Sequence, residues 1–257
     1  MTVEDLGDGV YGFFTVAARS LVIVTDAGVI YIDPLSREDA ERGLIALRKI
    51  TSQPVKIVIY SHQHWDHVLG AKVFKDQGAE IVSHAACVKW FERHPHPDLV
   101  MPDRTVAGGE VIALGGKRIQ LRYFGANHGD CLLVPWLLDR NMPFLVDLAT
   151  PGTLPIGAMP DYDPGEWVRT LKELEAIPFD TFISAHGPAT APKSVLTERR
   201  QFLEDVMAIV ARELKAGTPV KAIAAKIDLP QYAHLRGYPT ELPTLVDRLS
   251  YYYGMGW

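Results

Sequence analysis

The stretch "YSHQHWDH", residues 60–67, decides the fold, because it concentrates four metal-binding side chain types in six positions: His62, His64, Asp66 and His67. Imidazole and carboxylate groups are the ligands that zinc, iron and manganese take in proteins. The stretch directly follows "VKIVI", residues 55–59, an apolar run typical of a strand buried on both faces. In an extended or turning loop, alternate side chains point to the same side, so one ion can bind both His62 and His64.

Three further candidate ligands lie downstream, each in a segment that follows an apolar run. They are His128 in "GANHGDC", Asp147 in "FLVDLAT" and His186 in "ISAHGP". The carboxyl ends of strands are where α/β folds usually place their chemistry. Two neighbouring ions need more ligands than the first cluster offers, so the sequence predicts a site for two metals. For Asp147, a helix cap or a hydrogen bond to a ligand is an alternative role.

The segments around these residues predict a layered α/β fold. Short apolar runs at 10–14, 21–25 and 29–33 predict antiparallel strands, and residues 36–50 predict a helix with Ser36 as its N-cap. Further strands are expected between residues 102 and 147. After Pro192 the apolar spacing is helical. We therefore expect an α/β sandwich over residues 1–192 and a C-terminal helical extension over 193–257, packed on the same domain.

Composition excludes several classes of function. The chain has 257 residues, 47% of them hydrophobic, and a formal net charge of −5, without the basic stripe of a nucleic-acid-binding protein. It has no apolar run long enough to span a membrane, and its first residues lack the pattern of a signal peptide. Cys87 and Cys131 form no CxxC motif, so we expect no disulfide framework and a cytoplasmic, soluble protein.

The ordered set of candidate ligands resembles the metallo-β-lactamase superfamily over roughly residues 8–190. The resemblance implies a four-layer αββα sandwich with a dinuclear site, and it assigns the ligands as follows. The first metal would be held by His62, His64 and His128, and the second by Asp66, His67 and His186, with Asp147 bridging them. The histidine at the third position is more similar to the glyoxalase II and lactonase branches than to the lactamases with a cysteine ligand. Asn127 and Val146 depart from the glycines that the family often has there.

The resemblance implies a metal-dependent hydrolase with two divalent ions. We expect Zn²⁺, with iron or manganese as alternatives, because this ligand set accepts several divalent ions. A hydroxide bridging the two ions would attack a small carbonyl substrate: an ester, thioester, lactone or amide. Asp66 would also act in catalysis, by carrying a proton to the leaving group. The substrate is the one partner expected, and a homodimer stays open.

Five further residues are candidates for the surroundings of the metals. Asp33, which ends "VIYID", is a candidate hydrogen-bond partner of a ligand, with a turn or cap as the alternative. Trp65 lies inside the first cluster and is expected at the substrate pocket or its support. Tyr162 could donate to an oxyanion, with a plain connection to the helix at 165–176 as the alternative role of its loop. His234 and Tyr238 could line the pocket, although packing of the C-terminal helices is the simpler role for these two.

Other functions are compatible with parts of the same pattern. An iron-dependent oxidoreductase similar to persulfide dioxygenases shares the histidine pattern, and metal content and oxygen consumption would distinguish it. A diiron oxygen reductase is disfavoured, because Gln63 and His64 stand where those proteins carry a glutamate ligand. A phosphodiesterase or nuclease is disfavoured by the acidic balance. A binding protein with a decayed site is disfavoured by the complete set of ligands.

Overall fold

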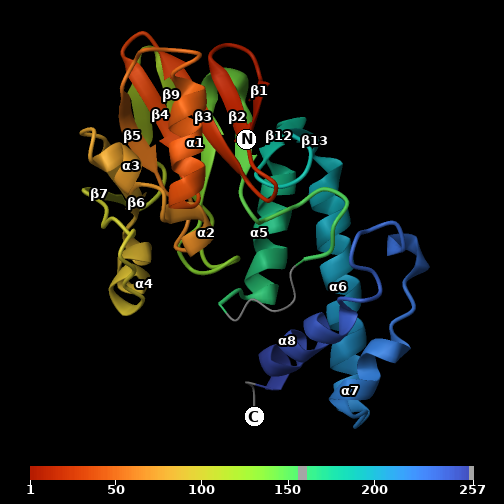
Figure 1. The fold of residues 1–257 in the computed structure, drawn as a ribbon. Coiled ribbons are helices and arrows are strands. Elements are labelled where there is room, and N and C mark those ends of the chain that lie inside the picture. The colour runs from red at the N-terminus through yellow and green to blue at the C-terminus, as the bar shows by residue number, and fades with distance from the viewer. Residues whose placement is uncertain (156–160, 255–257) are drawn as a thin grey trace.

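The computed structural model describes residues 1–155 and 161–254, and within these ranges the strands form two sheets (Figure 1). The first sheet has the order β1-β2-β3-β4-β5-β6-β7. Its strands are β1 (Thr2–Asp5), β2 (Val10–Phe14), β3 (Arg19–Thr25), β4 (Gly28–Ile32), β5 (Val55–Ile59), β6 (Glu80–His84) and β7 (Arg104–Val106). The pairing is antiparallel from β1 to β4 and parallel from β4 to β7. The run "VKIVI" is thus an internal strand, as its apolar composition predicts.

The second sheet has the order β13-β12-β11-β10-β9-β8. Its strands are β8 (Val111–Leu114), β9 (Lys117–Tyr123), β10 (Leu133–Leu137), β11 (Met142–Leu145), β12 (Thr181–Ser184) and β13 (Thr190–Pro192). Only β11 and β12 pair in parallel in this sheet, with Leu145 opposite Ser184. The parallel pair brings the carboxyl ends of two strands to the same edge of the sheet.

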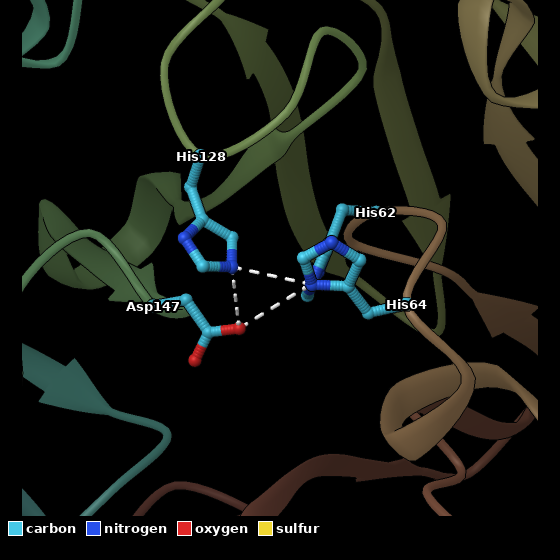
Figure 2. Close-up of side chains that lie close together, drawn as sticks. All are labelled: His62, His64, His128 and Asp147. Carbon is cyan, nitrogen blue, oxygen red and sulfur yellow. Dashed lines mark hydrogen bonds and ion pairs between the residues drawn. The ribbon is translucent and has the colours of Figure 1, made fainter. Parts of the chain in front are cut away.

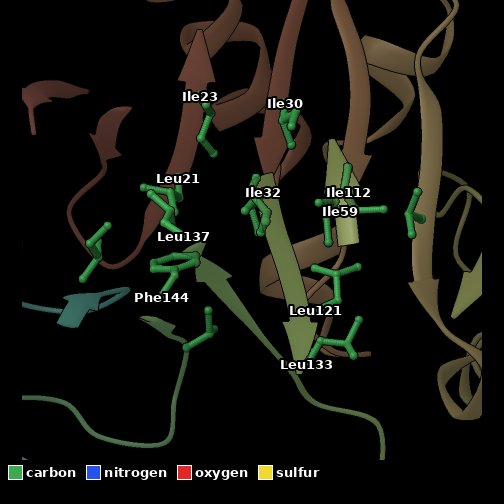
Figure 3. Packing of buried hydrophobic residues seen from close by; sticks show 14 of the residues in the cluster. Leu21, Ile23, Ile30, Ile32, Ile59, Ile112, Leu121, Leu133, Leu137 and Phe144 are labelled. Atoms are coloured by element: carbon green, nitrogen blue, oxygen red, sulfur yellow. The ribbon is translucent and has the colours of Figure 1, made fainter. Parts of the chain in front are cut away.

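The two sheets pack face to face, and alternation along the strands builds the layers. In β3, Leu21 and Ile23 point into the cluster between the sheets, whereas Val22 points into the cluster under the helices. Strand β4 repeats the pattern, with Ile30 and Ile32 on the inner face. Side chains from both sheets meet in this layer (Figure 3). A period of two residues is what a strand with two buried faces requires.

Helices cover the outer face of each sheet (Figure 1). On the first sheet these are α1 (Arg37–Leu47), α2 (Trp65–Val68), α3 (Lys72–Lys75), α4 (Val88–Arg93) and the 3₁₀ turn η1 (Ala85–Cys87). On the second they are α5 (Pro164–Ala176) and α6 (Ser194–Lys215), while η2 (Leu138–Arg140) joins β10 to β11. Ser36 caps α1 as predicted, because its hydroxyl accepts from the Asp39 amide. The four-layer αββα sandwich is confirmed.

The chain beyond α6 packs around the same helix. This part contains α7 (Val220–Ile223), η3 (Ala224–Lys226), η4 (Pro230–Tyr232) and α8 (Leu242–Gly254). Phe202, Val206 and Val210 of α6 form a buried cluster with side chains of these elements. The extension also touches the sandwich, since Arg236 pairs its backbone with Gly152 and Leu154. Within the described ranges, no helix combines the length and apolarity needed to cross a membrane.

The chain contains one disulfide, although the sequence predicted no disulfide framework. Cys87 of η1 and Cys131, which precedes β10, form a disulfide across 44 positions of sequence. The pairing joins the two halves of the sandwich and has no local sequence signal, because only the folded chain brings the two Cα atoms to 5.3 Å. The cysteines therefore give no support to the expected cytoplasmic location, because disulfides persist mainly in oxidising compartments.

A buried arginine also joins the two sheets. The Arg19 side chain is fully buried and pairs with Glu4 through Nε and Nη2, at 2.6 and 3.0 Å. Its guanidinium also donates to the backbone oxygens of Ser184 and Gly187. Arg19 therefore fixes the loop after β12 against β3, and this loop carries His186.

Replacing Arg19 by Leu should lower the free energy of unfolding by about 3 kcal/mol, because the backbone oxygens of Ser184 and Gly187 and the Glu4 carboxylate lose their donor. Urea denaturation of the purified variant measures the effect. The control is Arg104→Leu, because Arg104 and its partner Glu80 both have side chains that are about 40% exposed. This control should change the free energy of unfolding by less than about 1 kcal/mol. Equal effects of the two variants would contradict the role of Arg19.

Candidate metal centre

The candidate ligands come from both sheets and meet at one edge of the sandwich. The loop after β5 carries His62 and His64, and α2 carries His67. Asp147 and His186 each stand two residues beyond the end of a strand, β11 and β12 respectively. Because β11 and β12 are parallel and in register, these two side chains reach the same place. His128 arrives from the loop between β9 and β10.

Four of these residues form a first group. One ligand atom from each of His62, His64, His128 and Asp147 lies within 4.8 Å of the others. Asp147 Oδ2 is 3.3 Å from His62 Nε2 and 3.3 Å from His128 Nε2, and His128 Nε2 is 3.3 Å from His64 Nδ1. Figure 2 shows the three rings and the carboxylate converging on one point.

A second group shares the same carboxylate. His67, His186 and Asp147 also place their ligand atoms within 4.8 Å of one another. Asp147 Oδ2 is 3.4 Å from His67 Nε2, and Asp147 Oδ1 is 2.5 Å from His186 Nε2. The Asp147 backbone has a φ of 59°, a left-handed conformation that is uncommon outside glycine, asparagine and aspartate. The turn aims the carboxylate between the two groups.

The donor set fits two divalent ions. His62 Nε2 and His67 Nε2 are buried and lack a hydrogen-bond partner among the described residues. A buried polar atom without a partner is costly, and a metal at the centre would satisfy both nitrogens. Three imidazoles with a carboxylate, and two imidazoles with the same carboxylate, match the chemistry of zinc, iron or manganese sites.

Asp33 holds two of the ligands in place from behind. Its Oδ1 accepts from the Ser61 amide at 2.7 Å, and its Oδ2 accepts from the Ser61 hydroxyl at 2.7 Å and lies 3.1 Å from His67 Nδ1. The Ser61 hydroxyl in turn lies 2.8 Å from His62 Nδ1. A proton on His67 Nδ1 leaves Nε2 free for a metal. The structure therefore places Asp33 where the sequence suggested a supporting role.

Asp161 plays the same part for His64, and the sequence reasoning missed it. Its Oδ2 lies 2.8 Å from His64 Nε2 and accepts from Gln63 Nε2 at 2.6 Å. With Nε2 occupied, His64 presents Nδ1 to the first group. Asp161 lies almost 100 positions from His64 in a loop without a recognisable motif. In this loop the sequence predicted a role for the neighbouring Tyr162, as a pocket residue, and none for Asp161.

Burial and neighbouring charges set the protonation of these groups. Burial lowers the pKa of His62. Burial alone would lower the pKa of His67, but the Asp147 and Asp33 carboxylates outweigh it and raise that pKa well above its usual value. Burial would raise the pKa of Asp147, but His67 and His128 hold it well below its usual range. In the same way, His64 lowers the pKa of Asp161 to about 2, against the effect of burial. The centre thus holds one firmly ionised carboxylate among nitrogen donors.

Asp66 lies at the edge of this arrangement. Its side chain is 70% exposed, and its Oδ2 is 3.5 Å from His67 Nε2. It is not in the second group, whose ligand atoms come from His67, Asp147 and His186. The structure therefore brings six of the seven predicted ligands together and leaves Asp66 beside them.

Two cavities open next to the ligands. The first has a volume of about 430 Å³ and is lined by His128, Asp147, His186, Trp167 and two arginines, Arg199 and Arg236, among others. The second has about 490 Å³ and lies on the side of His64 and Asp66, where Trp65, Trp90 and Phe91 give it an aromatic wall. Trp65, a predicted pocket residue, lines this second cavity.

The other three predicted pocket residues line neither cavity. Tyr162 is buried in the core of the second sheet, packed edge-on against Trp167, and its hydroxyl has no partner among the described residues. His234 is exposed and bonds to Glu198 at 2.9 Å. The Tyr238 hydroxyl accepts from the Leu229 amide. Packing within the C-terminal extension accounts for the last two.

The chain is similar in sequence to several known proteins. The sequence profile described as the Metallo-beta-lactamase superfamily matches residues 15–186, about two thirds of the chain. Among curated proteins, the chain is similar to the 2,4-dinitroanisole O-demethylase subunit alpha of Nocardioides sp. (strain JS1661), with 22% identity over 94% of this chain and 71% of that protein. It is also similar to the linear primary-alkylsulfatase of Pseudomonas sp. (strain ATCC 19151), with 21% identity over 84% of this chain and 51% of that protein.

Solved structures share the fold. A metallo-beta-lactamase from Pontibacter korlensis superposes with a TM-score of 0.70 and 21% identity, covering 79% of this chain and 98% of that chain. The stereoselective inverting sec-alkylsulfatase Pisa1 from Pseudomonas sp. superposes with a TM-score of 0.79 and 17% identity, covering 96% of this chain and 50% of that chain. The chain spans about half the length of the alkylsulfatases that it matches.

Replacing Asp33 by Asn should weaken metal binding by the His67 group about tenfold to a hundredfold, because the carboxylate that fixes the His67 tautomer is lost. Asp161→Asn should weaken binding by the His64 group instead. Titration of the metal-free protein with Zn²⁺ against a chelating dye measures both affinities. The control is Asp139→Asn on the surface, where Asp139 pairs with Arg118. Wild-type affinities in both Asp33 and Asp161 variants would contradict the assignment.

Proposed function

We propose that this chain, which belongs to the metallo-beta-lactamase superfamily, is a metal-dependent hydrolase that uses two divalent ions to cleave an ester-like bond in a small molecule. One observation carries the proposal: a single, mostly buried carboxylate, Asp147, is shared by two groups of imidazoles, and it faces a cavity of about 430 Å³. A centre of this kind beside an open cavity can act on a bound substrate.

The ligand atoms assign the two ions. His62, His64 and His128 would hold the first, His67 and His186 the second, and Asp147 would contact both. Zn²⁺ is our first choice, because nitrogen-rich sites with one carboxylate suit it, with iron or manganese as alternatives. Such ions supply Lewis acidity toward a substrate oxygen and lower the pKa of a bound water toward neutrality.

The protein's own residues orient and protect this chemistry. Asp33 and Asp161 fix the tautomers of His67 and His64, so that each ring presents the correct nitrogen. The two cavities leave room for the two sides of a scissile bond, one beside His186 and one beside His64. Asp66 is exposed and lies next to His67, so we assign to it the transfer of a proton to the leaving group.

The substrate is a small molecule with an electrophilic centre bonded to oxygen, nitrogen or sulfur. Carbonyl substrates, namely esters, thioesters, lactones and amides, suit attack next to a Lewis acid. The names of the similar curated proteins add a sulfate ester and an aryl methyl ether to the substrates worth testing. We propose no nucleic-acid substrate, because the chain has a net charge of −5.

The proposal predicts metal-dependent hydrolysis. Protein freed of metal with a chelator should lose at least 99% of its activity on a panel of 4-nitrophenyl esters, thioesters, lactones and 4-nitrophenyl sulfate, and Zn²⁺ should restore it. Release of product is followed by absorbance, and oxygen uptake is followed in parallel.

Activity that survives chelation would contradict the proposal. Oxygen consumption by an iron-loaded protein, without hydrolysis, would replace it with the iron-dependent oxidoreductase. Cleavage of phosphodiesters in preference to every carbonyl substrate would replace it with the phosphodiesterase.

A further inference from the structure

The cavity beside Asp147 and His186 has a cationic wall. Its described lining contains two arginines, Arg199 and Arg236, and one carboxylate, Asp147, which belongs to the metal centre. Both arginines come from the chain beyond residue 192, so they lie outside the part matched by the superfamily profile. The extension therefore adds a charge to the cavity that the metal ligands do not account for.

Of the two arginines, Arg199 gives the stronger indication of a bound anion. It lies on α6, its side chain is buried, and only 5% of the residue is exposed. Its Nη2 donates to the backbone oxygens of Thr150 and Thr153, at 3.1 and 2.7 Å. Its Nη1 is buried without a hydrogen-bond partner among the described residues. The two bonds to the backbone fix the guanidinium and leave one of its arms unused.

No acidic side chain among the described residues forms an ion pair with Arg199. The nearest candidate in sequence, Glu198, bonds instead to His234. Burial lowers the pKa of Arg199 to about 10, and Glu198 partly opposes that change, so the group is still charged at neutral pH. A buried charge without a counter-ion is unfavourable, and proteins keep such groups where a ligand supplies the opposite charge.

Arg236 extends the charge to the surface. Its residue is exposed, and its side chain makes no hydrogen bond or ion pair within the described ranges. Its backbone is fixed, because the Arg236 amide donates to Gly152 and the Arg236 oxygen accepts from Leu154, at 2.9 and 3.0 Å. The segment that follows Asp147 thus contacts both arginines: its backbone oxygens accept from the Arg199 side chain, and its backbone bonds to that of Arg236.

We propose that this cavity binds an oxyanion of the substrate, with Arg199 as the buried anchor and Arg236 as a second contact nearer to solvent. The inference rests on the proposed function and narrows its substrate to a small anionic compound that carries a carboxylate or sulfate group. A guanidinium matches either group through paired N–H donors. Trp167 and Phe14, which also line the cavity, suit an apolar part of the same molecule.

Binding can be tested without turnover. Isothermal titration of the metal-loaded protein with 4-nitrobenzoate, and with 4-nitrobenzamide as the neutral molecule of the same shape, measures the preference for the anion. We expect the benzoate to bind at least tenfold more tightly than the amide. Arg199→Gln and Arg236→Gln should reduce that preference, whereas Arg199→Lys should retain part of it.

The matched control is Arg200→Gln, one position further on α6, because Arg200 pairs with Glu175 and Glu204 and lines neither cavity. The preference should be unchanged in this control. Arg236→Gln removes only an exposed side chain, so it keeps the test informative if Arg199→Gln fails to fold. An undiminished preference in Arg236→Gln, and in Arg199→Gln where that variant folds, would overturn the proposal. Loss of the same preference from metal-free protein would then place the anion on the metal.

Turnover then identifies the source of the oxyanion. 4-Nitrophenyl hydrogen succinate carries a carboxylate away from its ester, 4-nitrophenyl sulfate carries the anion at the reacting group, and 4-nitrophenyl butyrate is neutral. Arg236→Gln should lower kcat/KM severalfold for the succinate or the sulfate and leave the butyrate unchanged. Equal losses on all three would overturn the proposal. If the protein hydrolyses none of them, the titration still decides the anion site separately from the proposed function.

Discussion

The structure depends on one constraint: a single carboxylate must stand between two groups of imidazoles, and each group draws its side chains from both sheets. Asp147 leaves the second sheet in a left-handed turn, whereas His62, His64 and His67 leave the first. The groups meet only if the sheets pack at the correct separation and register. The apolar layer between the sheets, with Leu21, Ile32 and Phe144 in it, is therefore also what sets the geometry of the centre.

Other contacts narrow the freedom that this layer leaves. Arg19 links β3 to the loop that carries His186, and the Cys87–Cys131 disulfide links the helical layer of the first sheet to the segment that follows His128. Asp33 and Asp161 then fix the rings themselves. The apolar layer positions the sheets, the two links position the loops, and the two aspartates position single ring nitrogens. A site that binds metals with defined geometry requires restraint at all three levels.

Much of this could be predicted from the sequence, because the decisive residues are local or follow strand ends. The cluster at 60–67, the N-cap at Ser36 and the alternating strands have short-range signals, and Asp33 directly ends an apolar run. The disulfide, Asp161 and Arg199 have none: their roles depend on partners that folding brings from distant segments. The predicted pocket residues His234 and Tyr238 show the converse, since aromatic and histidine content alone does not say which cavity a side chain faces.

The central claim is that Asp147 serves two metal ions at once. Elemental analysis of the purified protein beside an Asp147→Ala variant, both reconstituted with Zn²⁺ and freed of excess metal, tests this most directly. The account predicts about two ions per chain in the wild type and a loss from both groups in the variant, so that less than one ion is retained. One ion per chain in both proteins, or two in both, would contradict it.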